Sequence, residues 1–199
     1  MRSLLEATRP DVAAAIILTG GASRRMGADK ATLIVDGVAM AQRLRQVLEE
    51  AGIADIVEAG SVDCPDEESE RQGPMAGIVA GWRHLQTHSC DSYDPTMVLS
   101  CDLPRLNAST VRSLIKAARQ HDDGAVAHDG ERMQPLVAAY RPSAYDEFER
   151  AYAAGERSVR KCFPVLDVGV VACDPSEIAD ADTPLDLIDH TVSWPPNDR

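Results

Sequence analysis

Apolar and polar positions alternate along the chain in blocks that predict strands and helices in turn. A continuous apolar run of strand length occupies residues 12–18, and residues 53–59 and 96–100 are predicted as two further strands. Such runs are typical of the central strands of a parallel sheet, which are covered on both faces. Residues 38–51 and 75–85 carry apolar side chains at helical spacing, and Gly52 follows the first of these segments, where a helix favours a terminal glycine.

The second half of the chain continues this alternation. A helix is predicted after a cap at Asn107 or Ser109. Two strands, residues 125–128 and 136–140, are predicted to join across Asp129–Gly130, which is a strong turn dipeptide. The remaining predicted elements are helices at residues 142–154, 157–163 and 183–189 and a strand at residues 165–172. Together these elements predict an α/β fold, a three-layer α/β/α sandwich around a Rossmann-like, mostly parallel sheet.

The length and the ends of the chain bear on its domain organisation. At 199 residues the chain suits a single domain, residues 1–199, that buries about two-thirds of its unfolded surface. We expect residues 1–11 to be a loose leader and residues 192–199 a loose tail. The apolar run that begins at Val12 is shorter than the roughly 20 residues that cross a membrane, and acidic as well as basic residues precede it. The sequence therefore predicts a cytoplasmic protein without a signal peptide or a membrane partner.

Net charge and cysteine content narrow the classes of function. The formal net charge of −12 argues against general nucleic-acid binding, because a phosphate backbone binds to a basic face. An anionic ligand would need a local basic pocket. The five cysteines are an odd number without a C-x-x-C pair, which favours reduced thiols over a disulfide framework or a zinc site.

One stretch, residues 16–33, departs from the acidic character of the chain. Its apolar start leads into two glycines, and three cations follow them, namely Arg24, Arg25 and Lys30. Adjacent glycines let the backbone come close to a ligand, so that several N–H groups can point at one anion. The motifs G-x-x-x-x-G-K-[ST] and G-x-G-x-x-G are both absent, which excludes a P-loop and a dinucleotide fingerprint. The stretch predicts an anion-binding loop of another kind, with a solvated charged turn as the alternative.

Residues 18–30, L-T-G-G-A-S-R-R-M-G-A-D-K, resemble the signature L-x-G-G-x-S-x-R-M-G-x-D-K of the molybdenum cofactor guanylyltransferases. Further matches follow in the order of that family along nearly the whole chain. They are Gly73–Gly77 (G-P-M-A-G), Ser100–Pro104 (S-C-D-L-P), Gln134–Leu136 with Tyr140–Arg141 on the strand of the second substrate, and Asp182–Leu187 (D-T-P-L-D-L). The resemblance implies a fold of the nucleotidyltransferase type.

The reaction that this resemblance implies is the transfer of GMP from GTP to the terminal phosphate of molybdopterin, with release of pyrophosphate. A phosphomonoester has its second pKa near 6, so this nucleophile is mostly ionised at pH 7 and needs no general base. Catalysis then rests on positioning and on neutralising the charge of the triphosphate. The resemblance also implies a molybdenum-insertion protein and acceptor molybdoenzymes as partners.

The resemblance also implies roles for individual residues. The catalytic candidates are Lys30, Arg24 and Arg25, which would clamp the triphosphate, and Asp102. Asp102 would hold Mg²⁺, a hard cation that commonly uses only one or two carboxylates, and Asp182 is the candidate for the second. The candidate nucleotide-binding residues are Leu18, Thr19, Gly20, Gly21, Ser23, Gly27, Lys30, Glu70, Gly73, Pro74, Gly77 and Asp102.

Several of these residues also have an ordinary structural interpretation. Asp102 could cap a turn before Pro104, and Asp182 could cap the helix that a Thr-Pro pair begins. Glu70 could belong to a solvated acidic loop. The basic cluster at residues 157–161 could be a solvated helix or a binding site for the pterin phosphate.

Two departures from the family pattern leave the choice of base open. Asp180–Asp182 (D-A-D) stands where these guanylyltransferases often carry Asn-x-Asn, and the strand end Val57–Gly60 lacks the asparagine that they often show. In contrast, Gly20–Gly21 favours guanine, because cytosine-specific relatives usually have Ala-Gly. The rival hypotheses are a cytidylyltransferase or other nucleotidyltransferase acting on a related phosphorylated acceptor, and a non-catalytic protein that binds a nucleotide or cofactor.

Overall fold

The computed structural model describes residues 12–19, 33–60, 73–88, 93–181, 184–187 and 192–193. The strands are β1 (Val12–Leu18), β2 (Ile34–Val35), β3 (Val38–Ala39), β4 (Asp55–Ala59), β5 (Tyr93–Ser100), β6 (Gly124–His128), β7 (Met133–Tyr140), β8 (Val168–Ala172) and β9 (Val192–Ser193). The helices are α1 (Met40–Ala51), α2 (Gly73–His88), α3 (Ala108–Ala118) and α4 (Pro142–Ala153), with the short 3-10 helices η2 (Val159–Val165) and η3 (Pro184–Leu187). None of the helices in these ranges combines the length and the apolarity that crossing a membrane requires.

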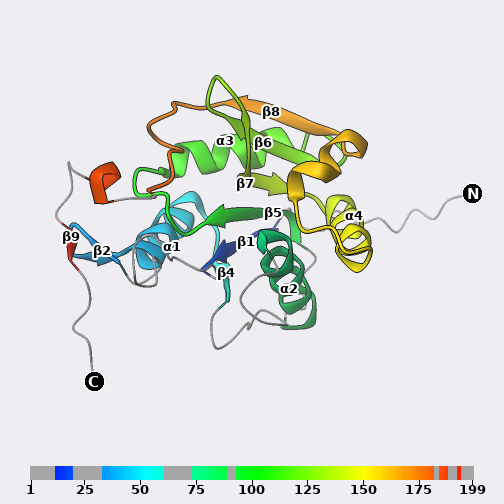
Figure 1. Cartoon of the computed structure of the whole chain (residues 1–199), viewed down its shortest axis with the longest axis horizontal. Helices are drawn as coiled ribbons and strands as arrows, with labels where there is room; N and C mark the ends of the chain where they lie inside the picture. Colours follow the sequence, from blue (N-terminus) through cyan, green and yellow to red (C-terminus); the bar gives the residue numbers. More distant parts are fainter. Residues whose placement is uncertain are drawn as a thin grey trace, which may run out of the picture.

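Six strands form one mixed sheet in the order β4-β1-β5-β7-β6-β8 (Figure 1). β4 and β5 pair with β1 in parallel, β8 pairs with β6 in parallel, and β7 runs antiparallel to both of its neighbours. Every strand of this sheet except β7 therefore points in the same direction. β6 and β7 form a hairpin across Asp129–Gly130, as predicted, and Gly130 there has a φ of 95°. The prediction of a mostly parallel sheet is confirmed.

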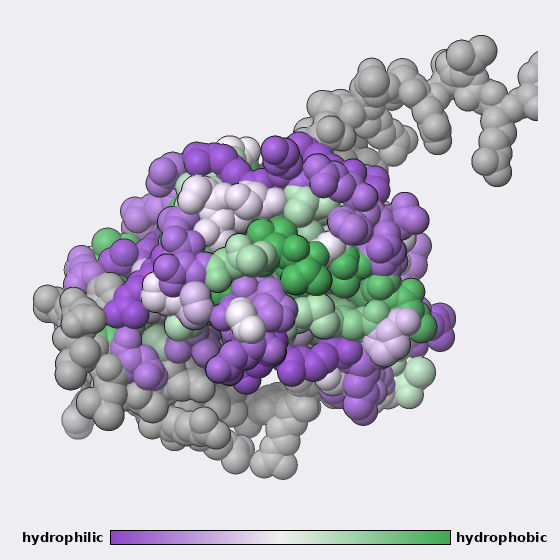
Figure 2. Space-filling model, turned by 90° about the horizontal axis from the view of Figure 1, so that it is seen from above, coloured by the Kyte–Doolittle hydropathy of each residue, from purple (hydrophilic) through white to green (hydrophobic). Residues whose placement is uncertain are grey.

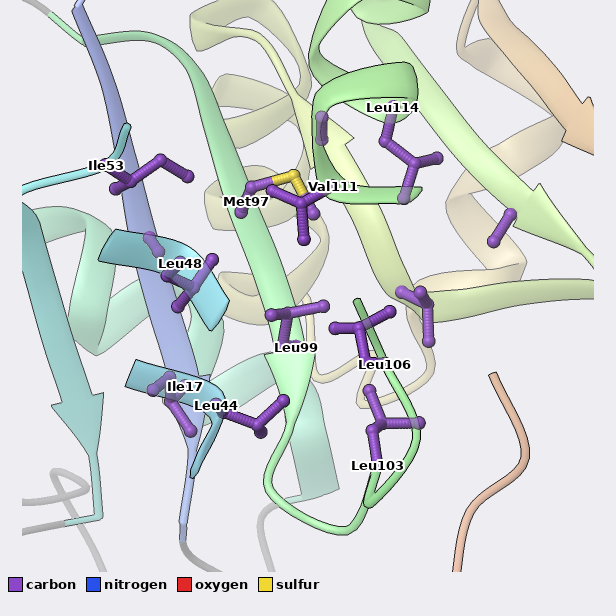
Figure 3. Close-up of a cluster of buried hydrophobic side chains, with 14 of the residues drawn as sticks. Ile17, Leu44, Leu48, Ile53, Met97, Leu99, Leu103, Leu106, Val111 and Leu114 are labelled. Carbon is purple, nitrogen blue, oxygen red and sulfur yellow. The ribbon is translucent and has the colours of Figure 1, made fainter. Parts of the chain in front are cut away.

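Alternating side chains bury the two faces of the sheet against different helices. In β1, Ala15 and Ile17 pack with α1 and α3, whereas Ala14 and Ile16 pack with α2 and α4. Figure 3 shows the first cluster, in which leucines of α1 and α3 surround apolar side chains of β1 and β5. Because β1 is apolar at every position, both faces of this strand are covered, as in other parallel sheets. The helix, sheet and helix layers confirm the three-layer sandwich.

Helix α2 packs closely on the sheet because Gly81 has no side chain. A Cβ added there would lie 2.7 Å from Cγ2 of Ile16 in β1. Trp82, the next residue, stacks on Tyr145 of α4 with ring centroids 4.1 Å apart. Buried side chains of α2 from Met75 to Leu85 lie in the same cluster as residues of β1 and α4, so these contacts hold the helix along its length.

The start of α1 differs from the prediction. Val38 and Ala39 form β3 and pair with β2, so the helix begins at Met40 rather than at Val38. The predicted end is confirmed, because Gly52 has a φ of 96° and its N–H bonds to the carbonyls of the last helical turn. Strand pairing therefore replaces the first turn of the predicted helix.

Two elements near the C-terminus also differ from the predictions. Val192–Ser193 form β9, which pairs with β2, so the expected loose tail is wrong at these two residues. The strand predicted from residue 165 begins at Val168, because Val165 still belongs to η2. Of the helix predicted at residues 183–189, the structure describes residues 184–187, which form η3.

Candidate active site

The carboxyl ends of β1 and β5 lie side by side in the middle of the sheet. From β1 the chain continues through α1 to β4 on one side, and from β5 it continues through α3 to β6 on the other. Open α/β sheets bind ligands at the point where the connections from two neighbouring parallel strands leave in opposite directions. The N–H of Cys101 donates to the carbonyl of Leu18 over 3.2 Å and joins the two ends. We call these ends, Leu18–Thr19 and Ser100–Asp102, the switch point.

Thr19 is held at the switch point by the neighbouring strand. Its backbone N–H and its hydroxyl Oγ1 both donate to the carbonyl of Ala59 in β4, each over 2.9 Å. The hydroxyl is thus committed as a donor to β4, and Thr19 sets the direction in which the chain leaves β1. The residues that follow lie outside the described residues, and they include the candidates Gly20, Gly21, Ser23, Arg24, Arg25, Gly27 and Lys30.

Asp102 lies at the end of β5, as its place after a predicted strand indicates. It is partly buried, and its backbone carbonyl accepts from the N–H of Ala181 over 2.8 Å. This bond brings the chain segment that leads to Asp182 against the switch point, although Asp182 itself, like Glu70, lies outside the described residues. Among the described residues there is no group of three potential metal ligands. Asp102 is the described residue that the resemblance assigns to Mg²⁺, a cation that commonly uses only one or two carboxylates.

Helix α2 begins at the same edge of the sheet, after the loop that follows β4. Gly73 has a φ of 70°, and a Cβ added to it would lie 3.1 Å from the carbonyl oxygen of Arg157. Both the backbone conformation and the available space therefore favour glycine. Pro74 lies in the first turn, as predicted, and Gly77 is buried inside the helix. The backbone N–H groups of this first turn and the helix dipole suit a phosphate.

Gln134, which the resemblance assigns to the strand of the second substrate, lies at the start of β7 at this edge of the sheet. The antiparallel register of β5 and β7 pairs Leu99 with Val137 near the end of β5. β7 runs antiparallel to β5, so the start of β7 lies at the edge of the sheet where β5 ends. Gln134 itself lies beyond this pairing and is a partner of Ala127 in β6.

Asp129 holds this glutamine in one orientation. Its Oδ1 accepts from the backbone N–H groups of Glu131 and Arg132, each over 2.8 Å, and its Oδ2 accepts from Nε2 of Gln134. These donors, the backbone groups first, lower the pKa of Asp129 from 3.8 to about 2. A carboxylate only accepts, so the amide turns its NH₂ toward Asp129 and its Oε1 away. The sequence marks Asp129 only as a turn residue, and its pairing with Gln134 could be found only from the folded hairpin.

The other end of β7 lies at the opposite edge of the sheet. Tyr140 is buried, and its hydroxyl donates to the carbonyl of Pro135 over 2.9 Å. Arg141 pairs with both carboxylate oxygens of Asp94, over 2.8 and 2.7 Å. Of the strand that the resemblance assigns to the second substrate, only the Gln134 end therefore reaches the edge that carries the switch point.

The basic cluster at residues 157–161 is tied into the fold. The guanidinium of Arg157 lies 4.2 Å from the ring centroid of Tyr152, and Arg160 donates to a backbone carbonyl of β7 over 3.1 Å. Lys161 pairs with Glu156 over 2.9 Å. The hydrogen bond from Lys161, together with nearby backbone N–H groups, lowers the pKa of Glu156 from 4.5 to about 2. Each of these three cations has a protein partner, and a role for the cluster in binding the pterin phosphate stays a prediction.

Comparison with known sequences supports a relationship over most of the chain. Residues 15–170 match the family described as the MobA-like NTP transferase domain. The chain is 32% identical over 184 residues to the molybdenum cofactor guanylyltransferase of Shewanella sp. (strain MR-4), which covers 85% of this chain and 90% of that protein. It is 33% identical over 184 residues to the molybdenum cofactor guanylyltransferase of Shewanella amazonensis, with coverages of 85% and 91%.

Solved structures share the fold. Molybdopterin-guanine dinucleotide biosynthesis protein A from Archaeoglobus fulgidus superposes with a TM-score of 0.61 at 21% identity, over 87% of this chain and 94% of that one. The 2-C-methyl-D-erythritol 4-phosphate cytidylyltransferase from Thermus thermophilus gives a TM-score of 0.59 at 16% identity, over 87% and 94%. The sequence match spans the switch point, the start of α2 and the β6–β7 hairpin. With this fold and this match, the chain belongs to the MobA-like NTP transferase family of nucleotidyltransferases.

Proposed function

We propose that the protein is a molybdenum cofactor guanylyltransferase, which transfers GMP from GTP to the terminal phosphate of molybdopterin. Relatives named for this activity align with most of the chain. The structural observation that carries the proposal is the Cys101–Leu18 hydrogen bond, which sets Asp102 beside the end of β1. From that end the chain enters the glycines and cations of residues 20–30. A carboxylate and an anion-binding loop thus leave adjacent strands, as a metal-dependent nucleotidyl transfer requires.

The proposed reaction is a single displacement at phosphorus. An oxygen of the acceptor phosphate attacks the α-phosphorus of GTP, the bond from that phosphorus to the β-phosphate oxygen breaks, and pyrophosphate leaves. Lys30, Arg24 and Arg25 neutralise the triphosphate and the leaving group, because charge stabilisation dominates such transfers. Mg²⁺ held by Asp102, with Asp182 as the candidate for a second ligand, would neutralise further phosphate charge.

We place the acceptor on the β7 side of the switch point. Gln134 lies at the start of β7, at the edge of the sheet that carries the switch point, and Asp129 accepts from its NH₂ group, which leaves Oε1 as an acceptor. An amide oxygen in a fixed position suits the N–H donors of a pterin ring. The nucleotide then occupies the other side, between the loop after β1 and the first turn of α2.

Glu58 lies in the strand end, residues 57–60, that lacks the asparagine often found in these guanylyltransferases. Its carboxylate does not argue against a guanine nucleotide. Nη2 of Arg45 in α1 donates to it over 2.8 Å. The ion pair neutralises the carboxylate and directs it toward α1. We therefore keep GTP as the proposed substrate, in a cytoplasmic step that receives its acceptor from a molybdenum-insertion protein and supplies molybdoenzymes.

The test is pyrophosphate release by the purified protein with molybdopterin and Mg²⁺, comparing GTP, CTP and ATP at equal concentration. We expect the highest turnover with GTP and loss of turnover after chelation of the metal. Faster turnover with CTP would identify a cytidylyltransferase. Nucleotide binding without pyrophosphate from any of the three would identify a non-catalytic binding protein.

A further inference from the structure

The chain that follows β8 crosses from the edge of the sheet to its centre. β8 is the last strand in the order of the sheet, and β6 and β7 separate it from β5. Figure 2 looks toward the β8 edge, where apolar residues form a band that hydrophilic residues border. From this edge residues 173–181, which we call the strap, lead to the backbone of Asp102. We propose that Glu177 of the strap is a positioning residue for Asp102; this rests on the role in binding Mg²⁺ that the proposed function gives to Asp102.

The side chain of Glu177 is anchored at the start of α3. Its Oε2 accepts from the hydroxyl of Thr110 over 2.7 Å, and Thr110 is only 7% exposed. Burial removes water from this hydroxyl, so a protein acceptor is needed there, and a carboxylate is a stronger one than a neutral group. Helix α3 carries no acidic residue in its own first turn. Glu177 therefore also brings a negative charge to the end of the helix dipole that favours it.

A compact turn within the strap sets the position of Glu177. The backbone N–H of Glu177 donates to the carbonyl of Asp174 over 3.0 Å. Oδ1 of Asp174 accepts from the N–H and the hydroxyl of Ser176, over 2.8 and 2.7 Å. The strap begins at Cys173, whose N–H donates to the carbonyl of His128 at the end of β6 over 3.0 Å. The turn is thus tied to the sheet before it reaches α3.

Beyond Glu177 the strap enters the core and ends at the switch point. Ile178 is buried in the cluster that also holds Leu103 and Leu106, which lie between β5 and α3. Figure 3 shows these two leucines below the start of α3. Ala181 is buried as well, and its N–H donates to the carbonyl of Asp102 over 2.8 Å. Contacts with α3, with the core and with Asp102 therefore follow one another along the strap.

Glu177 and Ala181 hold the two ends of the loop that carries Asp102. This loop, residues 101–107, begins after β5 and ends at Asn107, the cap of α3. The bond from the N–H of Cys101 to Leu18 fixes the backbone just before Asp102, and the bond from Ala181 fixes its carbonyl. The direction of a side chain follows from the backbone that bears it, so these two bonds aim the carboxylate. Glu177 stabilises the second bond by holding the strap against α3.

Hydrogen exchange at the amide of Ala181, measured in the full chain, tests this contact without any turnover. Glu177→Ala should raise the exchange rate about tenfold, because a hydrogen bond to a charged group is lost. Thr110→Val removes the other partner at nearly constant volume and should have a similar effect, and the double variant should exchange no faster than either single variant. Thr110→Ser keeps the hydroxyl and should exchange like the wild type.

Ser109→Ala is the matched control. Ser109 lies in the same turn of α3, but its hydroxyl donates to Asn107 over 2.6 Å rather than to the strap. The substitution weakens the start of the helix and leaves the contact of Glu177 in place. We therefore expect a lower melting temperature with unchanged exchange at Ala181.

The metal requirement tests the consequence for Asp102. In Glu177→Ala, the Mg²⁺ concentration that gives half-maximal pyrophosphate release should rise about tenfold, and saturating Mg²⁺ should restore kcat to near the wild-type value. The EPR signal of Mn²⁺, titrated into the protein with GTP and without acceptor, should show the same loss of affinity. Glu177→Gln, which keeps an acceptor oxygen but no charge, should give a smaller change. A variant that only destabilises the fold, as Ser109→Ala does, should leave both metal titrations unchanged.

Two results would overturn the proposal. One is exchange at Ala181 that is equal in Glu177→Ala, Thr110→Val and the wild type. The other is faster exchange with unchanged Mg²⁺ and Mn²⁺ titrations, because the strap would then not position Asp102. A wild-type chain that releases no pyrophosphate from any nucleotide would instead overturn the proposed function, and the exchange and Mn²⁺ measurements would still decide the role of Glu177.

Discussion

The backbone N–H of Ala181 donates to the backbone carbonyl of Asp102 over 2.8 Å. This bond docks the segment that leads to Asp182 against the end of β5. Because it uses the main chain of Asp102, replacing the side chain leaves the bond in place. The chemical role of the Asp102 carboxylate can therefore be tested by substitution without removing this main-chain bond.

Asp102→Ala should lower the rate of pyrophosphate release about 10²-fold or more, because it removes the proposed ligand of the metal that neutralises the phosphates. Lys30→Ala should lower the rate by a similar factor through loss of a triphosphate cation. Melting temperatures should stay near that of the wild type in both variants. Asp146→Ala, an exposed carboxylate of α4, is the control for loss of one negative charge. A rate near that of the wild type in either variant would remove that residue from the mechanism.

Gly73→Ala should destabilise the start of α2 and raise KM for GTP. Two features of Gly73 make the substitution unfavourable. Its φ of 70° strains a residue with a side chain, and the new Cβ would lie 3.1 Å from the carbonyl oxygen of Arg157. Gly155→Ala isolates the first feature, because Gly155 has a φ of 90° and nothing within 4 Å of an added Cβ. We expect Gly155→Ala to cost about 1 kcal/mol in urea denaturation and to leave KM unchanged. Equal KM values in the two variants would contradict a role for this helix start in binding the nucleotide.

The stability that Asp129 contributes should depend on acid pH. Its pKa is about 2 in the folded protein against 3.8 for the ordinary group, because N–H groups of the turn favour the charged form. A lowered pKa stabilises the fold above the unfolded value, and this contribution is lost as pH falls from about 4 toward 2. The gap in denaturation midpoint between wild type and Asp129→Asn should therefore be full at pH 7 and shrink below pH 4. A gap that is constant with pH would contradict the assignment.

Asp129→Asn should also raise KM for the acceptor more than it lowers kcat, because the amide of Gln134 loses its fixed orientation. Gln134→Leu, which removes the acceptor oxygen, should raise the same KM at least as much and leave KM for GTP unchanged. Glu131→Ala serves as the control, because it removes an exposed side chain from the turn and keeps the backbone N–H that bonds to Asp129. A change confined to kcat would place Gln134 outside the acceptor site.

Local patterns in the sequence determined most of the elements. The apolar run at residues 12–18 forms β1 with its predicted bounds. Asn107 caps α3 by accepting from the N–H of Thr110 over 3.0 Å, and Gly52 ends α1. The turn at Asp129–Gly130 joins the predicted strands. Each of these features depends on contacts within a few residues, which composition and spacing record directly.

The tertiary structure alone decided which of these elements meet. The insertion of β7 between β5 and β6 brings Gln134, at the start of β7, to the edge that carries the switch point and sends Arg141 to the opposite edge, where it pairs with Asp94. Pairing of β2 with β3 and β9 likewise takes Val38–Ala39 from the predicted helix and Val192–Ser193 from the predicted tail.

The physical reason is that strand order depends on backbone hydrogen bonds and side-chain packing between residues far apart in the chain. Local hydrophobic spacing is the same whichever strand becomes the neighbour. The sequence by itself therefore determined the elements, the fold class and the candidate chemistry of residues 18–30 and Asp102. The folded sheet decided that the ends of β1 and β5 adjoin, and that the turn residue Asp129 orients a side chain at the same edge.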